Sequence, residues 1–332
     1  MVSAVHFEPQ QPFGGKAWVV LVAGSHGWGD YGFQANIYHA YHIAVARGVP
    51  KENIIVFHYD DIAANPSNPT PGVVVNTPNG TDVYAGVPKD YTGKDHTVKN
   101  FFAALKGDQE LAKADKKVVN STLNDHIFVY FIDHGAPGYV LFPKEQMHNT
   151  DLIKTLTEMN AAKRFAKLVF YLEACESGSM FEKVLPNNIN VYGMTSTNST
   201  ELGWNCCRDT KRQAWVSSYF GYYWYKNWQS TDFVKETLQD QFEYLHNTTN
   251  QTGVMEPGQH AQHAHQWGDL SITKLPASQF QGPTPFIQVS NADLDKPICN
   301  PVNTREMPVQ MLEKNIEETN DMHEKLRLTQ EL

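Results

Sequence analysis

The stretch VFYLEACESGS, residues 169–179, places an apolar run directly before a polar turn. Its first four residues are β-branched, aromatic or aliphatic, which is typical of a strand buried in a parallel sheet. The turn that follows carries Glu173, Cys175 and Gly178. Cys175 is either a packing residue at the end of a strand or the nucleophile of an enzyme, and a lone cysteine in such a place more often packs. The choice depends on what the rest of the chain brings beside it.

Similar apolar runs recur along the chain and alternate with helical patterns. Strands are predicted at residues 17–25, 53–59, 126–135, 167–174 and 189–196, and helices near residues 34–47, 98–105 and 151–162. Strands that alternate with helices form a mainly parallel sheet with helices on both faces, so the predicted fold class is α/β. Further predictions are a long loop at residues 60–93, a hairpin around residues 139–142, and aromatic-rich helices at residues 215–228 and 233–246.

Length and composition restrict the class of protein. The chain has 332 residues, of which 41% are hydrophobic, and this suits a globular protein. Its net charge of -9 and the lack of a basic stripe argue against a nucleic-acid partner. No apolar run approaches the ~20 residues that cross a bilayer, so no membrane partner is expected. We predict a globular domain at residues 1–286, followed by a linker and a helical tail at residues 287–332.

Two predicted strands end in residues that carry chemistry. The carboxyl ends of parallel strands gather at one edge of an open α/β sheet, where ligands bind. One strand ends in Asp133, His134 and Gly135, and the other in Glu173 and Cys175. His134 and Cys175 lie 41 residues apart, which allows one crossover between adjacent parallel strands. From their joint placement alone, two interpretations are about equally well supported: the residues form a Cys-His dyad, or they are two unrelated packing residues.

The dyad interpretation gives each neighbour a role. An imidazole beside a thiol makes the nucleophilic thiolate available. Glu173 should point the same way as Cys175, because side chains alternate along a strand. A carboxylate beside a thiol opposes thiolate formation, so Glu173 is better interpreted as a substrate contact. Gly135 and Gly178 allow close approach of a substrate, and amides near them could bind an oxyanion.

Motifs along nearly the whole chain resemble those of one peptidase family. YFIDHG and FYLEACESGSMFE are similar to sequences of legumains, also called asparaginyl endopeptidases or vacuolar processing enzymes. WVVLVAGSHGW and LPNNINVYGMTSTN match in the same order, and the tail MLEKNIEETNDMHEKLRLTQEL resembles the activation peptide. The resemblance implies a caspase-like three-layer sandwich with a six-stranded, mostly parallel sheet. It also implies thiol-dependent hydrolysis of peptide and protein substrates without a cofactor.

Carried over by position, the resemblance assigns roles to individual residues. Cys175 would be the nucleophile and His134 the general base and acid, and the amides of Gly135 and Cys175 would bind the oxyanion. Asp133 occupies a position associated with succinimide formation and ligase activity. Family members are acid-activated zymogens that are cut after an asparagine near Asn320, so a lysosomal, vacuolar or secreted protein is expected. A helical prodomain covers the active site in the family, and the tail here is a possible intramolecular inhibitor.

The sequence departs from the family where specificity is decided. Asp30 replaces the asparagine that orients the catalytic histidine, although a carboxylate can still accept from an imidazole N–H. Four positions of the specificity pocket are also changed, to Gly32, Phe33, Gly203 and Ser218. A pocket that hydrogen-bonds a carboxamide depends on such polar groups. We therefore expect a wider, more apolar pocket in which the retained Glu173 suits a basic or neutral residue. The alternative is that a different polar set retains the preference for asparagine.

Other features carry weaker signals. Five Asn-X-Ser/Thr sequons are candidate glycosylation sites and hint at a secretory route: Asn79, Asn120, Asn198, Asn247 and Asn250. Cys206 or Cys207 could pair with Cys299 in an oxidising compartment. His260, His263 and His265 are more typical of a solvated loop than of a metal site, and no metal is predicted.

Two further functions compete with the legumain-like peptidase. The first is a transamidase of the same fold, which the absence of a membrane segment and the sequence EACESGS argue against. The second is a catalytically silent homologue that acts as a binding or decoy protein. Intact His134 and Cys175 argue against that role, whereas Asp30 and the altered pocket favour it.

Overall fold

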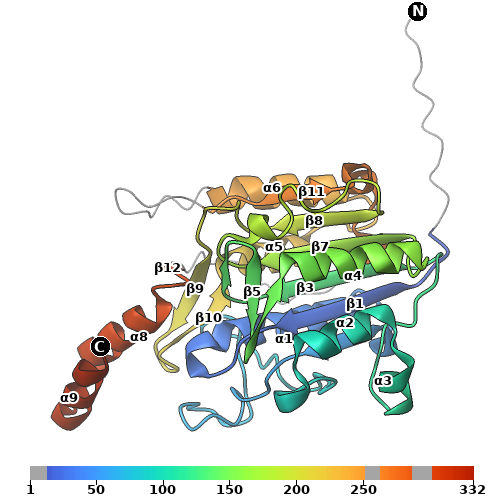
Figure 1. Ribbon diagram of the computed structural model, residues 1–332. Helices are drawn as coiled ribbons and strands as arrows, with labels where there is room; N and C mark the ends of the chain where they lie inside the picture. The colour runs from blue at the N-terminus through green and yellow to red at the C-terminus, as the bar shows by residue number, and fades with distance from the viewer. Residues whose placement is uncertain (1–12, 251–261, 286–300) are drawn as a thin grey trace, which may run out of the picture.

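A six-stranded sheet forms the centre of the molecule (Figure 1), in a computed structural model that describes residues 13–250, 262–285 and 301–332. The strand order is β11-β8-β7-β3-β1-β2. The strands are β1 (Ala17–Ala23), β2 (Ile54–Phe57), β3 (His126–Ile132), β7 (Lys167–Glu173), β8 (Val191–Thr195) and β11 (His265–Gly268). Neighbouring strands are parallel except for β11, which runs antiparallel to β8. The predicted six-stranded, mostly parallel sheet is confirmed.

Helices cover both faces of this sheet and complete a three-layer sandwich. One layer holds α1 (Tyr31–Ala46), α5 (Tyr219–Ser230), α6 (Leu238–Asn250) and α7 (Ser278–Gln281). The other holds α2 (Val98–Lys106) and α4 (Asn149–Ala161), with the short α3 (Gln109–Lys113) beside them. Alternate residues of β1 serve the two cores: Val19 packs with the first layer and Val20 with the second. Burial on both faces explains why the strands read as continuous apolar runs.

Two small sheets flank the edge where the parallel strands end. One is built from β4 (Gly135–Ala136), β5 (Tyr139–Phe142) and β6 (Glu145–His148), which confirms the predicted hairpin. The other has the order β10-β9-β12, from β9 (Trp204–Asp209), β10 (Ala214–Ser218) and β12 (Val302–Asn303). Because β12 lies beyond the predicted domain end at residue 286, the start of the tail is part of a sheet of the globular domain. The helices α8 (Met307–Glu318) and α9 (Met322–Glu331) follow.

Two helix predictions start too early. The segment from Trp215 to Ser218 is strand β10, because it pairs antiparallel with β9. Helix α5 begins only at Tyr219, where the hydroxyl of Ser218 caps it by accepting from the amide of Gly221. The helix expected from Phe233 begins at Leu238, because the amide of Phe233 donates to the carbonyl of Pro285 instead. Residues 60–92 form the predicted loop.

A buried arginine fixes the last residues of the segment that ends at 285. The guanidinium of Arg47, at the end of α1, donates to the carbonyls of Thr284 at 2.8 Å and Pro285 at 2.6 Å. It also donates to the carbonyls of Trp228 and Thr231. The side chain is fully buried, and of its four carbonyl partners within the described residues only that of Pro285 has a second donor, the amide of Phe233.

We expect Arg47→Leu to lower the free energy of unfolding by about 3 kcal/mol, because it leaves several buried carbonyls without a donor. Denaturant titration of the full chain measures this change. The matched control is Lys106→Ala, which removes a half-exposed cation beside Glu158 and should change the free energy by less than about 0.5 kcal/mol. Equal effects of the two substitutions would contradict the role given to Arg47.

Candidate active site

The ends of β3 and β7 bring the two predicted sequence motifs together. These strands pair in parallel up to Ile132 opposite Glu173, so residues 133–135 and 174–175 leave the sheet at one edge. The amide of Asp133 donates to the carbonyl of Glu173 at 3.1 Å. A Cβ added to Gly135 would lie 2.4 Å from the carbonyl oxygen of Cys175, so only glycine allows this approach.

The imidazole of His134 contacts the carboxylate of Asp30. The Nε2 atom of His134 and the Oδ1 atom of Asp30 are 2.9 Å apart, and their side chains are 24% and 18% exposed. Burial alone would lower the pKa of His134. The hydrogen bond and charge of Asp30 outweigh burial and raise the pKa of His134 above its usual value. Phe33 packs its ring edge-on against this imidazole, with centroids 5.2 Å apart.

Cys175 is buried beside a backbone hydrogen-bond donor. It is 1% exposed, and its Sγ atom accepts from the amide of Gly203 at 3.2 Å. Burial raises the pKa of the Cys175 thiol, and the Gly203 amide and the charge of Arg305 oppose that rise. The thiol is therefore protonated at neutral pH and needs a base to become a nucleophile.

Asp133 is buried next to His134. Its Oδ1 atom accepts from the amide of His134 at 2.5 Å. Burial raises the pKa of Asp133 to about 8, so the carboxyl is protonated at neutral pH. Gly24 makes room for it, because an added Cβ at Gly24 would lie 2.0 Å from Asp133 Oδ2.

Glu173 is buried and surrounded by donors. Its Oε2 atom accepts from the hydroxyl of Tyr130 at 2.6 Å. Burial raises the pKa of Glu173 to about 7, and hydrogen bonds from Tyr130, Ser218 and the amides of Gly221 and Phe220 limit that rise. These partners occupy the carboxyl group, which leaves it little capacity for a charged substrate group.

Of the other predicted pocket positions, Ser218 and Gly203 lie beside functional groups. Ser218 hydrogen-bonds Glu173, and Gly203 contacts Cys175. Gly32 instead lies close to the backbone of β10, since an added Cβ would lie 2.9 Å from the carbonyl oxygen of Trp215. A side chain at this position would need β10 to move, so glycine sets how closely α1 and β10 pack.

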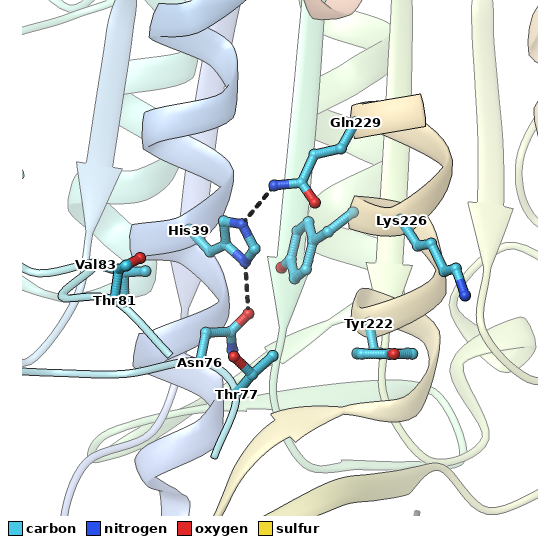
Figure 2. Close-up of a pocket in the computed structure, with 9 residues that line it drawn as sticks. His39, Asn76, Thr77, Thr81, Val83, Tyr222, Lys226 and Gln229 are labelled. Atoms are coloured by element: carbon cyan, nitrogen blue, oxygen red, sulfur yellow. Dashed lines mark hydrogen bonds between the residues drawn. The ribbon is translucent and has the colours of Figure 1, made fainter. Parts of the chain in front are cut away.

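A polar network that reaches Ser218 is not predicted by the sequence. Figure 2 shows the ring of His39 between Gln229, 2.9 Å away, and Asn76, 2.8 Å away. The amide of Asn76 donates to Asn36 Oδ1 at 2.7 Å, and the amide of Asn36 donates to Ser218 Oγ at 2.5 Å. Hydrogen bonds therefore run from His39 to Ser218, the partner of Glu173. Asn36 and His39 lie one turn apart on α1, but polar residues at this spacing give no sign of the hydrogen bonds that they form.

The tail reaches the same edge of the sheet through a residue that sequence reasoning missed. Arg305 donates to the carbonyl of Gly135 at 3.1 Å and to Glu176 Oε2 at 2.6 Å. The amide of Thr304 donates to the carbonyl of Gly203 at 2.9 Å, in line with the pairing of β12 on β9. The segment at residues 302–305 therefore lies across the edge that carries Cys175 and His134.

The remaining candidate residues are scattered. The sequon residues Asn79, Asn120, Asn247 and Asn250 are exposed, whereas Asn198 is half-buried. Asn198 Oδ1 accepts from the amides of Thr200 and Glu201. Asn320 is exposed in the connection between α8 and α9.

Two weaker predictions are settled only in part. The Sγ atoms of Cys206 and Cys207 lie 2.9 Å apart. Cys299 lies outside the described residues, so its pairing with either of them stays a prediction. The expected solvated loop is wrong for His265, which pairs with β8 as part of β11. His263 forms an ion pair with Glu201, and His260 lies outside the described residues. Within the described ranges, no group of three or more histidine, cysteine or acidic residues has the arrangement of a metal site, and no helix has the length and apolarity needed to span a bilayer.

Comparisons with known proteins agree with these features. A family model described as the Peptidase C13 family matches residues 17–283. Human legumain is 42% identical over 328 residues, which cover 96% of this chain and 72% of that protein. Vacuolar-processing enzyme beta-isozyme 1 of Oryza sativa subsp. japonica is 37% identical and covers 96% and 66%. Hemoglobinase of Schistosoma mansoni is 37% identical and covers 94% and 70%.

A solved structure of caspase-1 from Spodoptera frugiperda is matched with a TM-score of 0.46 and 10% identity, over 81% of this chain and 94% of that one. The sequence matches span the strands of the central sheet and both motifs at its edge. The chain therefore belongs to the peptidase C13 family and is a legumain-like cysteine-type endopeptidase.

Proposed function

We propose that this protein hydrolyses peptide bonds with Cys175 as nucleophile, His134 as general base and acid, and Asp30 as the partner that holds the imidazole. The observation that carries the proposal is the junction of β3 and β7, with His134 bound to Asp30 at 2.9 Å. The substrates are peptides or proteins, since the chain belongs to a peptidase family.

The reaction proceeds in two stages. His134 takes the proton of Cys175 while Sγ bonds to the carbonyl carbon of the substrate, and the amides of Gly135 and Cys175 donate to the oxyanion. His134 returns the proton to the leaving amine as the C–N bond breaks, which leaves a thioester. His134 then removes a proton from water, the hydroxide attacks the thioester, and the thiol leaves with the proton. Asp30 stabilises the imidazolium in both stages.

Ligation uses the same thioester. An amine of a second peptide that attacks in place of water forms a new peptide bond and releases Cys175. Asp133 is the candidate for a succinimide, in which the amide nitrogen of His134 bonds to the Asp133 carboxyl carbon and water leaves. The contact of 2.5 Å between that nitrogen and Asp133 Oδ1 supports this assignment, as does burial of the carboxyl group.

The proposed specificity pocket favours a neutral side chain before the cleaved bond. Glu173 is its retained carboxyl group, and four hydrogen-bond donors already occupy it. Gly32 provides no side chain, and Phe33 packs on His134. These features support altered specificity over strict cleavage after asparagine, and they weigh against a basic residue.

We also propose that the tail inhibits the enzyme, because residues 302–305 contact Gly135, Glu176 and Gly203 beside the nucleophile. Exposure of Asn320 between two helices suits a processing site. Exposed sequons support a secretory route to a lysosome or vacuole or to the outside of the cell, as does the similarity to a vacuolar-processing enzyme. Asn79, Asn120, Asn247 and Asn250 are the preferred glycosylation candidates over the half-buried Asn198.

A peptide library tests the function and the pocket together. We expect the full chain to cleave after neutral residues, and Cys175→Ala to lower the rate by at least about 10³-fold. Mass spectrometry of the products from about pH 4 to about pH 8 identifies the cleaved bonds. Equal products from the wild type and from Cys175→Ala would contradict the proposal that Cys175 is the nucleophile of a peptidase. Cleavage confined to asparagine would overturn only the altered pocket.

Asp30→Asn tests the histidine pair. The carboxylate of Asp30 helps to raise the pKa of His134, so removal of its charge should lower that pKa. His134 must be neutral to take the proton of Cys175. The limb of the kcat/KM profile that reports its protonation should therefore move to lower pH by about one unit. An unchanged limb would show that Asp30 does not act on the base.

Arg305→Ala tests the tail in the full chain. It removes one ion pair and one hydrogen bond, together about 1 kcal/mol, so the initial cleavage rate should rise about fivefold. The matched control is Arg327→Ala, because Arg327 pairs only within α9, with Glu324 and Glu331. Equal rates for the wild type and Arg305→Ala would argue against inhibition through this contact.

A further inference from the structure

The loop at residues 196–204 borders the nucleophile turn on two sides. The amide of Glu176, the residue after Cys175, donates to the carbonyl of Glu201 at 2.7 Å. Two residues further along the loop, the amide of Gly203 donates to Cys175 Sγ at 3.2 Å. The position of the sulfur's backbone donor therefore depends on how this loop is held.

A side-chain pair fixes the loop from the segment that precedes β11. Glu201 Oε1 accepts from Nδ1 of His263 at 2.7 Å. Glu201 Oε2 accepts from the amide of His263 at 3.2 Å and from the amide of Asn198 at 3.1 Å. The side chains of Glu201 and His263 are 12% and 29% exposed, so water and salt screen this pair less than a surface pair. It joins segments that lie 62 residues apart in the chain.

A second contact from the same segment holds the other side of Gly203. The carbonyl oxygen of the Gln262 side chain accepts from the amide of Trp204 at 3.0 Å, and Gln262 is fully buried. Residues 262 and 263 thus hold the loop just before and just after Gly203. With both contacts in place, the Gly203 peptide has little freedom to turn away from the sulfur.

We propose that Glu201 and His263 form a latch that holds the Gly203 amide against Cys175 and thereby sets the reactivity of the thiol. Both are positioning residues that act through Gly203. A hydrogen bond to a sulfur stabilises the thiolate over the thiol, so the latch makes Cys175 easier to deprotonate. This inference rests on the proposed function, in which Cys175 is the nucleophile.

Neighbouring groups supply a matched control. The ring of His246 lies 5.8 Å from that of His263, and His265 completes the group of imidazoles, with Glu182 nearby. His246 donates through Nδ1 to the carbonyl of Ala264 at 2.8 Å, and not to the loop. Replacement of His246 therefore removes a neighbouring imidazole without removing the hydrogen bonds of the latch.

The test is the pH dependence of Cys175 alkylation in the full chain. Iodoacetamide is the probe, and mass spectrometry counts modification of the peptide that contains Cys175, because the chain has three other cysteines. The measured quantity is the pH at which the alkylation rate is half its maximum. The size of the rate is less informative, because the tail contact limits access to the thiol and changes the rate at every pH.

His263→Leu removes the imidazole, and Glu201→Gln leaves too few acceptors for the donors that the carboxylate serves. Each should raise the midpoint by about one pH unit, as loss of a hydrogen bond to a charged group does. His263→Asn should restore most of the wild-type midpoint, because its amide nitrogen can take the place of Nδ1. His246→Leu should leave the midpoint unchanged.

Wild-type midpoints in both His263→Leu and Glu201→Gln would overturn the latch. If His263→Leu fails to fold, the alkylation midpoints of Glu201→Gln and His263→Asn are compared. A raised midpoint in Glu201→Gln with a wild-type midpoint in His263→Asn supports the latch, whereas the same midpoint in both variants overturns it. An upward shift in His246→Leu as large as that in His263→Leu would also overturn it, because loss of any nearby imidazole would then have the same effect. Failure of the proposed function shows differently, as peptide cleavage that survives Cys175→Ala.

Discussion

The register between β3 and β7 is the constraint on which the site depends. Parallel pairing carries both chains to the same edge, and the amide of Asp133 still donates to the carbonyl of Glu173 after the last paired residues. Gly135 then touches the backbone of Cys175, where any side chain would collide. A slip of one residue would turn every side chain of a strand to the opposite face. It would separate the histidine from the thiol while the core remained apolar.

Burial at this edge determines where charge can reside. Asp133, with a pKa of about 8, and Glu173, with a pKa of about 7, lie in the interior, where burial disfavours the carboxylate. The thiol of Cys175 is disfavoured as an anion for the same reason. Asp30 and His134 are the partly exposed pair, and water and their mutual contact stabilise charge there. A proton that leaves the sulfur is therefore best held on His134, next to Asp30.

The sequence predicts most of the central sheet because each of its strands satisfies a local pattern. Residues 126–132 and 167–173 are apolar on both faces, and the strand ends are marked by Asp133-His134-Gly135 and by Cys175. The sequence does not predict β10, because Trp215 and Val216 stand only a few residues before the aromatic run of α5, and only the pairing with β9 distinguishes strand from helix.

Long-range contacts account for what the sequence does not predict in the site. Arg305 meets Gly135 across 170 positions, and Glu201 meets His263 across 62. Asn36 likewise reaches Ser218 across 182. Each of these residues lies in a segment whose local pattern is ordinary for a tail, a loop or a helix. Only the folded arrangement gives them a role, so a motif search that starts from Cys175 and His134 passes over them.

Gly203 links the nucleophile to the tail through its two backbone groups. Its amide donates to Cys175 Sγ, and its carbonyl accepts from the amide of Thr304. An extended peptide that adds to β9 as a further strand would need the same carbonyl, since strand addition uses backbone groups in register. The tail and such a substrate would therefore compete for the carbonyl, whereas the bond to the sulfur persists in either state. The charge of Arg305 also opposes the rise in the pKa of Cys175. The tail therefore covers the nucleophile and favours its thiolate at the same time, so inhibition by the tail and activation of the thiol are coupled.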